Sequence, residues 1–384
     1  MNRETGRLRI LYIDNIRIYL TVLVVLHHVA IGYGGVGGWF VIEAPSDSIS
    51  PVLLFLFNAL NQSYFMSFFF LLSGYFLCGS CNRKGPGPCM RGRLVRLGIP
   101  LLAYIVLIAP SIDYLVLTFT RHRDVTLFQV FSYFITRHRV DVGPLWFVEA
   151  LLIFSALFVI RRRFLEQRGR EANRPPFMNR FPSSTAIVIS ILALSAGTFL
   201  VRLVFPIGVW IVHFQLAHFV HYIFCFCAGI LAYRGNWLEH LSAKQWRLWT
   251  WAALGSVILL PVIVGISLAT GNGPEIFFGG FSFAALAAAL WESMACLSII
   301  IALLGVFRKW LNHQGRIAKT LSRNAYTVYL IHALVITALM AALYNSAWPS
   351  AAKFGLVSLL GVAGCFLISH FVIRRLPGAK RVLG

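Results

Sequence analysis

Chemically reactive side chains recur in the first apolar segment of the sequence, over about residues 10–33. Asp14, Arg17, His27 and His28 stand there among aliphatic residues, and Asp14, three residues before Arg17, is close enough to pair with it. In an α-helix the eleven steps from Arg17 to His28 make about three turns, so both side chains share one face, about 16 Å apart. A guanidinium group can hold a phosphate, and a neutral imidazole ring can accept a proton from a hydroxyl group. The spacing therefore favours a functional stripe that binds an anion at one end and removes a proton at the other.

Other polar residues in apolar surroundings are weaker candidates. Arg93 and Arg96 are three residues apart and share a helix face, and Glu149 and Glu292 each stand inside an apolar segment. Either carboxyl group could orient His28 or bind a substrate hydroxyl, and a simple helix–helix hydrogen bond is an equal alternative. No cluster has the spacing of a metal site, so no metal is predicted. His213, His218 and His221 are interpreted as an interfacial cluster, and Ser73 and Gly74 as small residues for close helix packing.

The composition indicates the elements that carry these residues. Of the 384 residues, 58% are hydrophobic and 12% are charged, which excludes a soluble globular protein and a disordered chain. The apolar residues form blocks long enough to cross a bilayer as helices. We predict an all-α, polytopic integral membrane protein with a single domain over residues 1–384. Its ten predicted spans cover about residues 10–33, 51–78, 97–118, 144–160, 183–205, 210–233, 248–270, 277–306, 325–344 and 352–373.

The net charge of +21 reflects membrane topology. With cytoplasmic N- and C-termini, 27 of the 34 Lys and Arg residues fall in cytoplasmic segments and five in outer segments. This imbalance follows the positive-inside rule, so nucleic acid is not an expected partner, whereas membrane lipids are. The remaining two cations, Arg17 and Arg202, lie within spans. Because the first span is long, polar and without a cleavage site, we do not expect it to be a cleavable signal.

The positions of the cysteines give an expectation about disulfide bonds. Most of the seven cysteines lie in spans, and Cys81 and Cys89 lie on the predicted cytoplasmic side, so no disulfide is expected. Cys78 and Cys81 are interpreted as small apolar residues at a helix end.

Two identical Thr-Arg-His-Arg tetrapeptides flank an apolar stretch in the outer segment 120–139. That stretch lies either at the interface or back inside the protein, and its arginines either snorkel or contact an anionic partner.

Five segments, in order along almost the whole chain, resemble the motifs of the acyltransferase 3 family. They are Asp14-Asn-Ile-Arg17 followed by His28, Phe68-Phe-Phe-Leu-Leu-Ser-Gly-Tyr75, Arg93-Leu-Val-Arg96-Leu-Gly-Ile-Pro100, Gly143-Pro-Leu-Trp146-Phe-Val-Glu149, and Leu321-Ser-Arg-Asn-Ala-Tyr-Thr-Val-Tyr-Leu-Ile-His332. The fourth segment is similar to the glucan-succinyltransferase-like branch. Asn15 and Ile18 stand where the family often has glycine, and the spacing from Trp146 to Glu149 differs from that of other branches.

The resemblance implies an inner-membrane O-acyltransferase. Such an enzyme moves an acetyl or succinyl group from acyl-CoA to a hydroxyl group of a carbohydrate or glycolipid. Acyl-CoA is the donor co-substrate, and the resemblance implies no bound cofactor. His28 would be the general base, or would carry the acyl group transiently, and Glu149 a second catalytic residue. Arg17, Arg93 and Arg96 would bind the phosphates of CoA, although positive-inside anchoring explains Arg93 and Arg96 equally well. Asp14, Trp146, Glu292 and His332 would bind substrate.

Two other classes of function fit parts of the sequence. A transporter or flippase of a lipid-linked or small polar substrate would use the same buried charges as a path. It would show repeats or matched broken helices, and the sequence has no evident repeat. A membrane sensor or scaffold leaves the aligned Arg17 and His28 unexplained.

Overall fold

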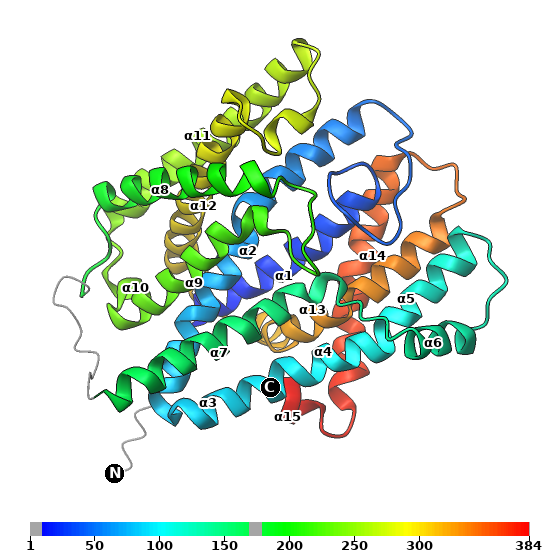
Figure 1. The fold of residues 1–384 in the computed structure, drawn as a ribbon, viewed down its shortest axis with the longest axis horizontal. Coiled ribbons are helices and arrows are strands. Elements are labelled where there is room, and N and C mark those ends of the chain that lie inside the picture. The colour runs from blue at the N-terminus through cyan, green and yellow to red at the C-terminus, as the bar shows by residue number, and fades with distance from the viewer. Residues whose placement is uncertain (1–9, 169–178, 384) are drawn as a thin grey trace.

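The protein is a bundle of long apolar helices in the computed structural model, which describes residues 10–168 and 179–383 (Figure 1). Within these residues it is helical without a named strand, and ten helical segments are long and apolar enough to cross a membrane. The predicted all-α fold with ten spans is thereby confirmed. These segments are α1 (Leu11–Gly32), α2 (Ile49–Lys84), Pro86–Thr120, Gly143–Gln167, α8 (Ser184–Val204), Leu216–Arg234, α11 (Ala243–Ala269), α12 (Phe283–Trp310), α13 (Arg316–Leu343) and Ser350–Arg375.

Several spanning segments are built from more than one helical piece. The third comprises α3 (Pro86–Arg93), η1 (Leu94–Gly98), α4 (Ile99–Ala103), η2 (Tyr104–Ile108), α5 (Ala109–Leu115) and η3 (Val116–Thr120). The 3₁₀ turn η4 (Gly143–Leu145) precedes α7 (Trp146–Gln167), and η6 (Leu216–His218) precedes α9 (Phe219–Arg234). At the end of the chain, α14 (Ser350–Phe371) continues into η8 (Ile373–Arg375). The remaining elements are α6 (Leu127–Thr136), α10 (Trp237–His240), η7 (Pro274–Phe277) and α15 (Ala379–Leu383).

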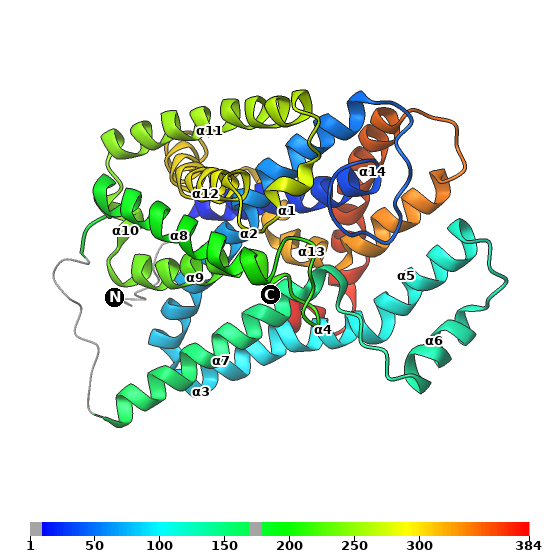
Figure 2. The same ribbon diagram turned by 45° about the horizontal axis from the view of Figure 1, so that its top comes forward.

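The third span is a single rod interrupted by three π-helical stretches, and it runs beside α7 (Figure 2). Pro100 explains one irregularity because it lacks the N–H that would bond to the carbonyl of Arg96 four residues earlier. That carbonyl accepts a hydrogen bond of 2.7 Å from the hydroxyl group of Tyr326 on α13. In a bilayer a freed backbone group needs such a partner, so the proline ties the arginine-bearing end of this rod to α13.

Helices α2 and α9 pack closely because glycines remove the side chains between them. A Cβ atom on Gly74 would lie 2.1 Å from the carbonyl oxygen of Phe226, and one on Gly229 would lie 2.0 Å from that of Leu71. Both neighbours are backbone atoms, which cannot move without displacing a helix. The interpretation of Gly74 as a packing residue is confirmed.

Replacing Gly229 with Ala is expected to destabilise the protein by about 1–3 kcal/mol, because the methyl group overpacks this contact. Thermal unfolding of the purified protein in detergent measures the effect. Gly255→Ala on α11 is the matched control, since a Cβ atom there meets nothing within 4 Å. The control should be neutral or slightly more stable, and an equal loss in both variants would contradict the packing argument.

The expectation of no disulfide is wrong, because Cys81 and Cys89 form one with their Cα atoms 5.1 Å apart. Helix α2 continues past the predicted span to Lys84, and the chain reverses at Gly85, whose φ is +81°. The first turn of α3 therefore returns Cys89 to the last turn of α2. The sequence positions alone gave no sign of this reversal.

Other predicted boundaries also shift. Residues 205–215, which overlap the predicted sixth span at 210–233, form a loop, and α13 begins at Arg316 instead of 325. The apolar part of segment 120–139 forms α6, whose exposed side includes Leu127, Phe128 and Ile135. Helix α6 lies alongside α5 at the periphery (Figure 1), an arrangement that fits the interfacial alternative.

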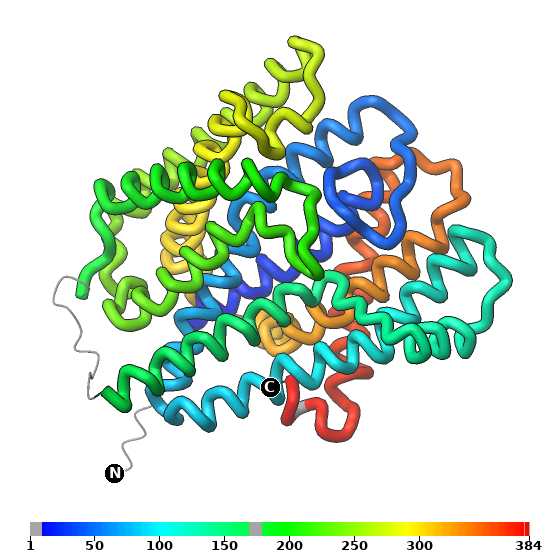
Figure 3. The backbone as a smooth tube through the Cα atoms, viewed as in Figure 1, coloured from blue at the N-terminus to red at the C-terminus, as the bar shows by residue number. Residues whose placement is uncertain are grey.

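The loop 33–48 between α1 and α2 folds back over one end of the bundle (Figure 3). Lys353 of α14 forms a buried ion pair with Glu43, and the hydroxyl groups of Ser46 and Ser350 lie 3.1 Å apart. These contacts anchor the loop above the end of α1 that carries His28.

Candidate active site

A cavity of about 520 Å³ lies at the end of the bundle where α1 ends and α2 begins. Its wall takes residues from α1, α2, α7, α8, α9, α11 and α12 and from the loops 33–48 and 205–215. The volume is in the range of small-molecule sites. Three residues predicted from the sequence line it, namely His28, Trp146 and Glu292.

His28 is held by a chain of hydrogen bonds that begins on α13. His332, which is fully buried, has its Nδ1 atom 2.6 Å from the carbonyl oxygen of Tyr329 and its Nε2 atom 3.2 Å from Nδ1 of His28. The indole ring of Trp39 stacks against the His28 ring, with the centroids 4.3 Å apart. These contacts fix the orientation of the His28 imidazole ring relative to His332 and Trp39.

These contacts also determine the tautomer of His28. A carbonyl oxygen only accepts, so Nδ1 of His332 carries the hydrogen, and in the neutral ring Nε2 of His332 is an acceptor. His28 must then donate from Nδ1, which leaves its own lone pair on Nε2. The assignment rests on the hydrogen-bond pattern. It makes Nε2 of His28 the atom able to accept a proton in the cavity wall.

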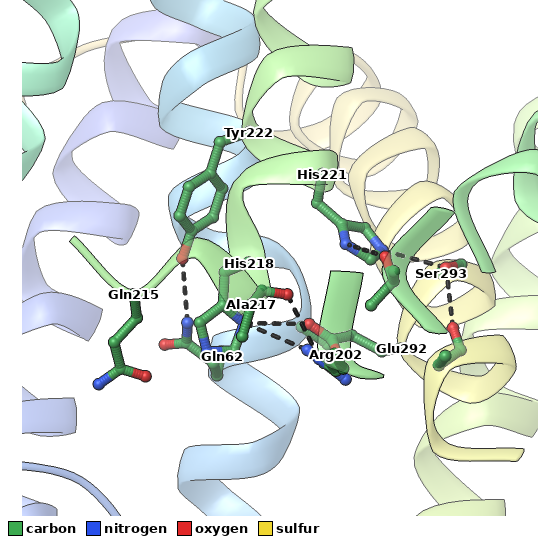
Figure 4. A network of polar contacts seen from close by, with 12 residues as sticks. Gln62, Arg202, Gln215, Ala217, His218, His221, Tyr222, Glu292 and Ser293 are labelled. Atoms are coloured by element: carbon green, nitrogen blue, oxygen red, sulfur yellow. Dashed lines mark hydrogen bonds and ion pairs between the residues drawn. The ribbon is translucent and has the colours of Figure 1, made fainter. Parts of the chain in front are cut away.

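A second polar group in the cavity wall combines three helical elements. Arg202 near the end of α8 is 2% exposed, and its Nη2 atom lies 2.6 Å from Oε2 of Glu292 on α12. His218 of η6 places Nδ1 3.4 Å from Oε1 of the same carboxylate (Figure 4). Arg202 also donates from Nε to the carbonyl oxygen of Ala217 at 3.3 Å. We call Arg202, His218 and Glu292 the ion-pair cluster.

A third group lies at the opposite end of α1 and brings together the predicted arginines. Arg93 interacts electrostatically with Arg96, Arg17 and Tyr326. The expected pairing of Asp14 with Arg17 is confirmed, with Nη1 3.7 Å from Oδ1, and the Arg17 side chain remains 44% exposed. Within the described chain, none of Arg17, Arg93 and Arg96 lines the cavity. The stripe from Arg17 to His28 is thus a shared helix face of which this cavity includes only the His28 end.

Glu149 lies apart from His28. Its Oε2 atom is 3.0 Å from Nδ1 of His213, so the contact joins the first turn of α7 to the loop 205–215. Among the described residues, His28 hydrogen-bonds to His332 and to no carboxylate. The catalytic role of Glu149 stays a prediction, as do the substrate-binding roles of Asp14, Trp146, Glu292 and His332.

Sequence reasoning missed Arg202, His218 and Gln62 as candidates for this cavity. A signal existed for Arg202, since a cation inside an apolar span is a functional candidate. The sequence interpretation treats His218 as part of an interfacial cluster, but its Nδ1 atom contacts the carboxylate of Glu292 on α12. His213 is on the loop, so the three histidines do not form one helical cluster.

One comparison decides the kind of protein that carries this site. A family model described as an acyltransferase domain matches residues 10–370, nearly the whole chain. The chain belongs to the acyltransferase 3 family. No curated protein and no solved structure matches it.

Family membership gives the cavity its general chemistry. The protein is a multi-pass membrane acyltransferase, so it transfers an acyl group between two substrates. In this acyltransferase 3 member, the cavity presents a histidine whose lone pair and ring orientation are set by a neighbouring histidine, which suits proton removal from an attacking group.

Proposed function

We propose that this protein is an O-acyltransferase that moves an acetyl or succinyl group from acyl-CoA to a hydroxyl group of a carbohydrate or glycolipid. The observation that carries the proposal is the hydrogen-bonded chain from the carbonyl oxygen of Tyr329 through His332 to His28. That chain orients the imidazole of His28 in the wall of a cavity of substrate size, which supports a role for His28 as the general base.

The proposed reaction has two steps. The acceptor oxygen attacks the thioester carbonyl carbon while Nε2 of His28 takes the hydroxyl proton, and a carbon–oxygen bond forms. The tetrahedral intermediate then collapses, its carbon–sulfur bond breaks, and the imidazolium returns the proton to the departing sulfur atom of CoA. No external oxidant, reductant or metal is needed for the balance.

The donor is proposed to bind with its phosphates at the arginine end. Arg17, Arg93 and Arg96 come from two spans and gather at the end of α1 opposite His28. Guanidinium groups match phosphate oxygens in geometry and charge. The count of 27 Lys and Arg residues against five supports placing this end and both termini in the cytoplasm, where acyl-CoA is made. The protein would then act as one domain in a bacterial inner membrane, with the cavity on its outer side.

The direct test supplies radiolabelled acetyl-CoA or succinyl-CoA to the purified protein together with candidate glycoside acceptors. We expect release of CoA that depends on the acceptor, and label that appears in an ester of the acceptor. Release without an acylated product would mean simple thioester hydrolysis. Exchange of a substrate across vesicles without CoA release would indicate transport and contradict the proposal.

Arg93→Gln is expected to raise the KM for acyl-CoA about tenfold or more, because a charged hydrogen bond to phosphate is lost. The KM for the same acyl group on pantetheine, which lacks the nucleotide phosphates, should not change. Initial rates with the two donors measure the difference. Arg316→Gln, an exposed arginine at the start of α13, is the control and should affect neither donor. Equal effects on both donors would contradict phosphate binding at Arg93.

A further inference from the structure

The ion-pair cluster occupies the same cavity as His28, but proton removal by His28 does not use it. Charged side chains in a membrane-spanning region are expensive to bury, and they are retained where they are paired or serve a substrate. Arg202 has the support of both Glu292 and a backbone carbonyl, so the cluster is rigid before any ligand arrives. All three residues of the cluster line the cavity.

Aromatic rings stand beside the cluster in the cavity wall. The rings of Trp146 and Tyr222 stack with their centroids 5.6 Å apart, and the indole N–H of Trp291 donates to the carbonyl oxygen of Ser256 at 2.9 Å. Gln62 donates from Nε2 to the hydroxyl oxygen of Tyr222 at 3.0 Å (Figure 4). The negative face of an aromatic ring attracts the C–H groups of a pyranose, while planar polar groups pair with its hydroxyl groups.

Two buried polar atoms of residues in the same cavity wall lack a hydrogen-bond partner among the described residues. They are Oδ1 of Asn58 and Nδ1 of His27, and the two residues are 2% and 6% exposed. Both residues line the cavity. Buried polar groups are nearly always satisfied, so these atoms point to a polar ligand.

We propose that the ion-pair cluster is the acceptor subsite and that it selects a neutral, hydroxyl-rich acceptor over an acidic one. This rests on the proposed function. A sugar hydroxyl can donate to Glu292 and a neighbouring hydroxyl can accept from Arg202, so a diol pairs with both charges without separating them. A carboxylate on the acceptor would meet the negative charge of Glu292 and compete for a guanidinium already bonded at 2.6 Å.

The test replaces both charges at once, in the variant Arg202→Met/Glu292→Leu. Two apolar side chains of similar size leave no unpaired charge, so this double variant is expected to fold. Binding of methyl hexosides and of methyl hexuronosides is followed by tryptophan fluorescence, since Trp146 and Trp291 line the cavity. The starting protein should bind the neutral glycosides at least tenfold more tightly than the acidic ones. The double variant should bind the neutral glycosides at least tenfold more weakly, with an unchanged KM for acyl-CoA.

The control removes an ion pair elsewhere. Arg162 and Glu166 pair at 2.8 Å on the exposed far end of α7, and Arg162→Met/Glu166→Leu should leave glycoside binding unchanged. Unchanged glycoside binding in the Arg202/Glu292 double variant, or equal binding of neutral and acidic glycosides by the starting protein, would overturn the proposal. Glycoside binding that is lost in the double variant, in a protein that transfers no acyl group, would support the subsite and refute the proposed function.

Discussion

His28→Gln is expected to lower kcat for acyl transfer about 10²- to 10⁴-fold, which is the usual contribution of a positioned general base. Glutamine retains hydrogen-bonding ability near Nδ1 of His28 but cannot take up a proton. The KM for acyl-CoA should stay close to its starting value, because the substitution leaves unchanged the arginines that we propose to bind the CoA phosphates. Acceptor-dependent CoA release, with protein abundance in the membrane measured in parallel, gives the result.

His221→Gln is the matched control for loss of a buried histidine. His221 is 1% exposed, bonds to Thr198 and Ser293, and does not line the cavity. The control should keep transfer within a few-fold of the starting rate. Retained activity in His28→Gln, or an equal loss in both variants, would remove His28 from the mechanism.

The features predicted correctly from the sequence are local ones. Hydropathy over a window of residues predicts a span without knowledge of its neighbours, and helix geometry alone places Arg17 and His28 on one face. The pairing of Asp14 with Arg17 follows from a separation of three residues within one turn. None of these inferences requires knowing which helices touch.

The contacts that build the cavity depend on helix packing and were beyond such reasoning. His28 and His332 are in contact although 304 residues separate them in the sequence. Glu292 contacts Arg202 and His218, which belong to two other segments of the chain. Which helices meet is set by close contacts such as that between Gly229 and Leu71. The disulfide was missed because the expectation rested on the side of the membrane, whereas the pairing depends on where α2 ends and how the chain turns back to bring Cys89 to Cys81.

The shared helix face of Arg17 and His28 does not by itself show whether the arginine end of α1 is connected to the cavity. Thr21 and Val24 lie on it, are 3% and 1% exposed, and separate the arginine end from the cavity. Thr21 donates its hydroxyl hydrogen to the carbonyl oxygen of Arg17 at 2.8 Å, so it turns toward its own helix. A donor that spans both ends must therefore displace side chains packed against this part of α1, and substrate binding should involve local movement there.

Glu292→Leu alone is expected to destabilise the protein by about 3–5 kcal/mol, because it leaves Arg202 buried, charged and without its carboxylate. Arginine keeps its charge in proteins, so deprotonation cannot relieve the cost. Adding Arg202→Met should recover most of the loss, since the second substitution removes the stranded charge. Thermal unfolding in detergent, followed for the starting protein and the single and double variants, measures this coupling.

The same comparison separates structural from functional roles of the cluster. A pair without a role in acceptor binding would give a double variant with normal stability and a normal acceptor KM. We expect normal stability with a raised acceptor KM, because the hydroxyl partners are gone although the cavity wall is intact. Equal destabilisation by the single and the double variants would contradict the stranded-charge argument, because it would show that lost packing, and not an unpaired guanidinium, causes the effect.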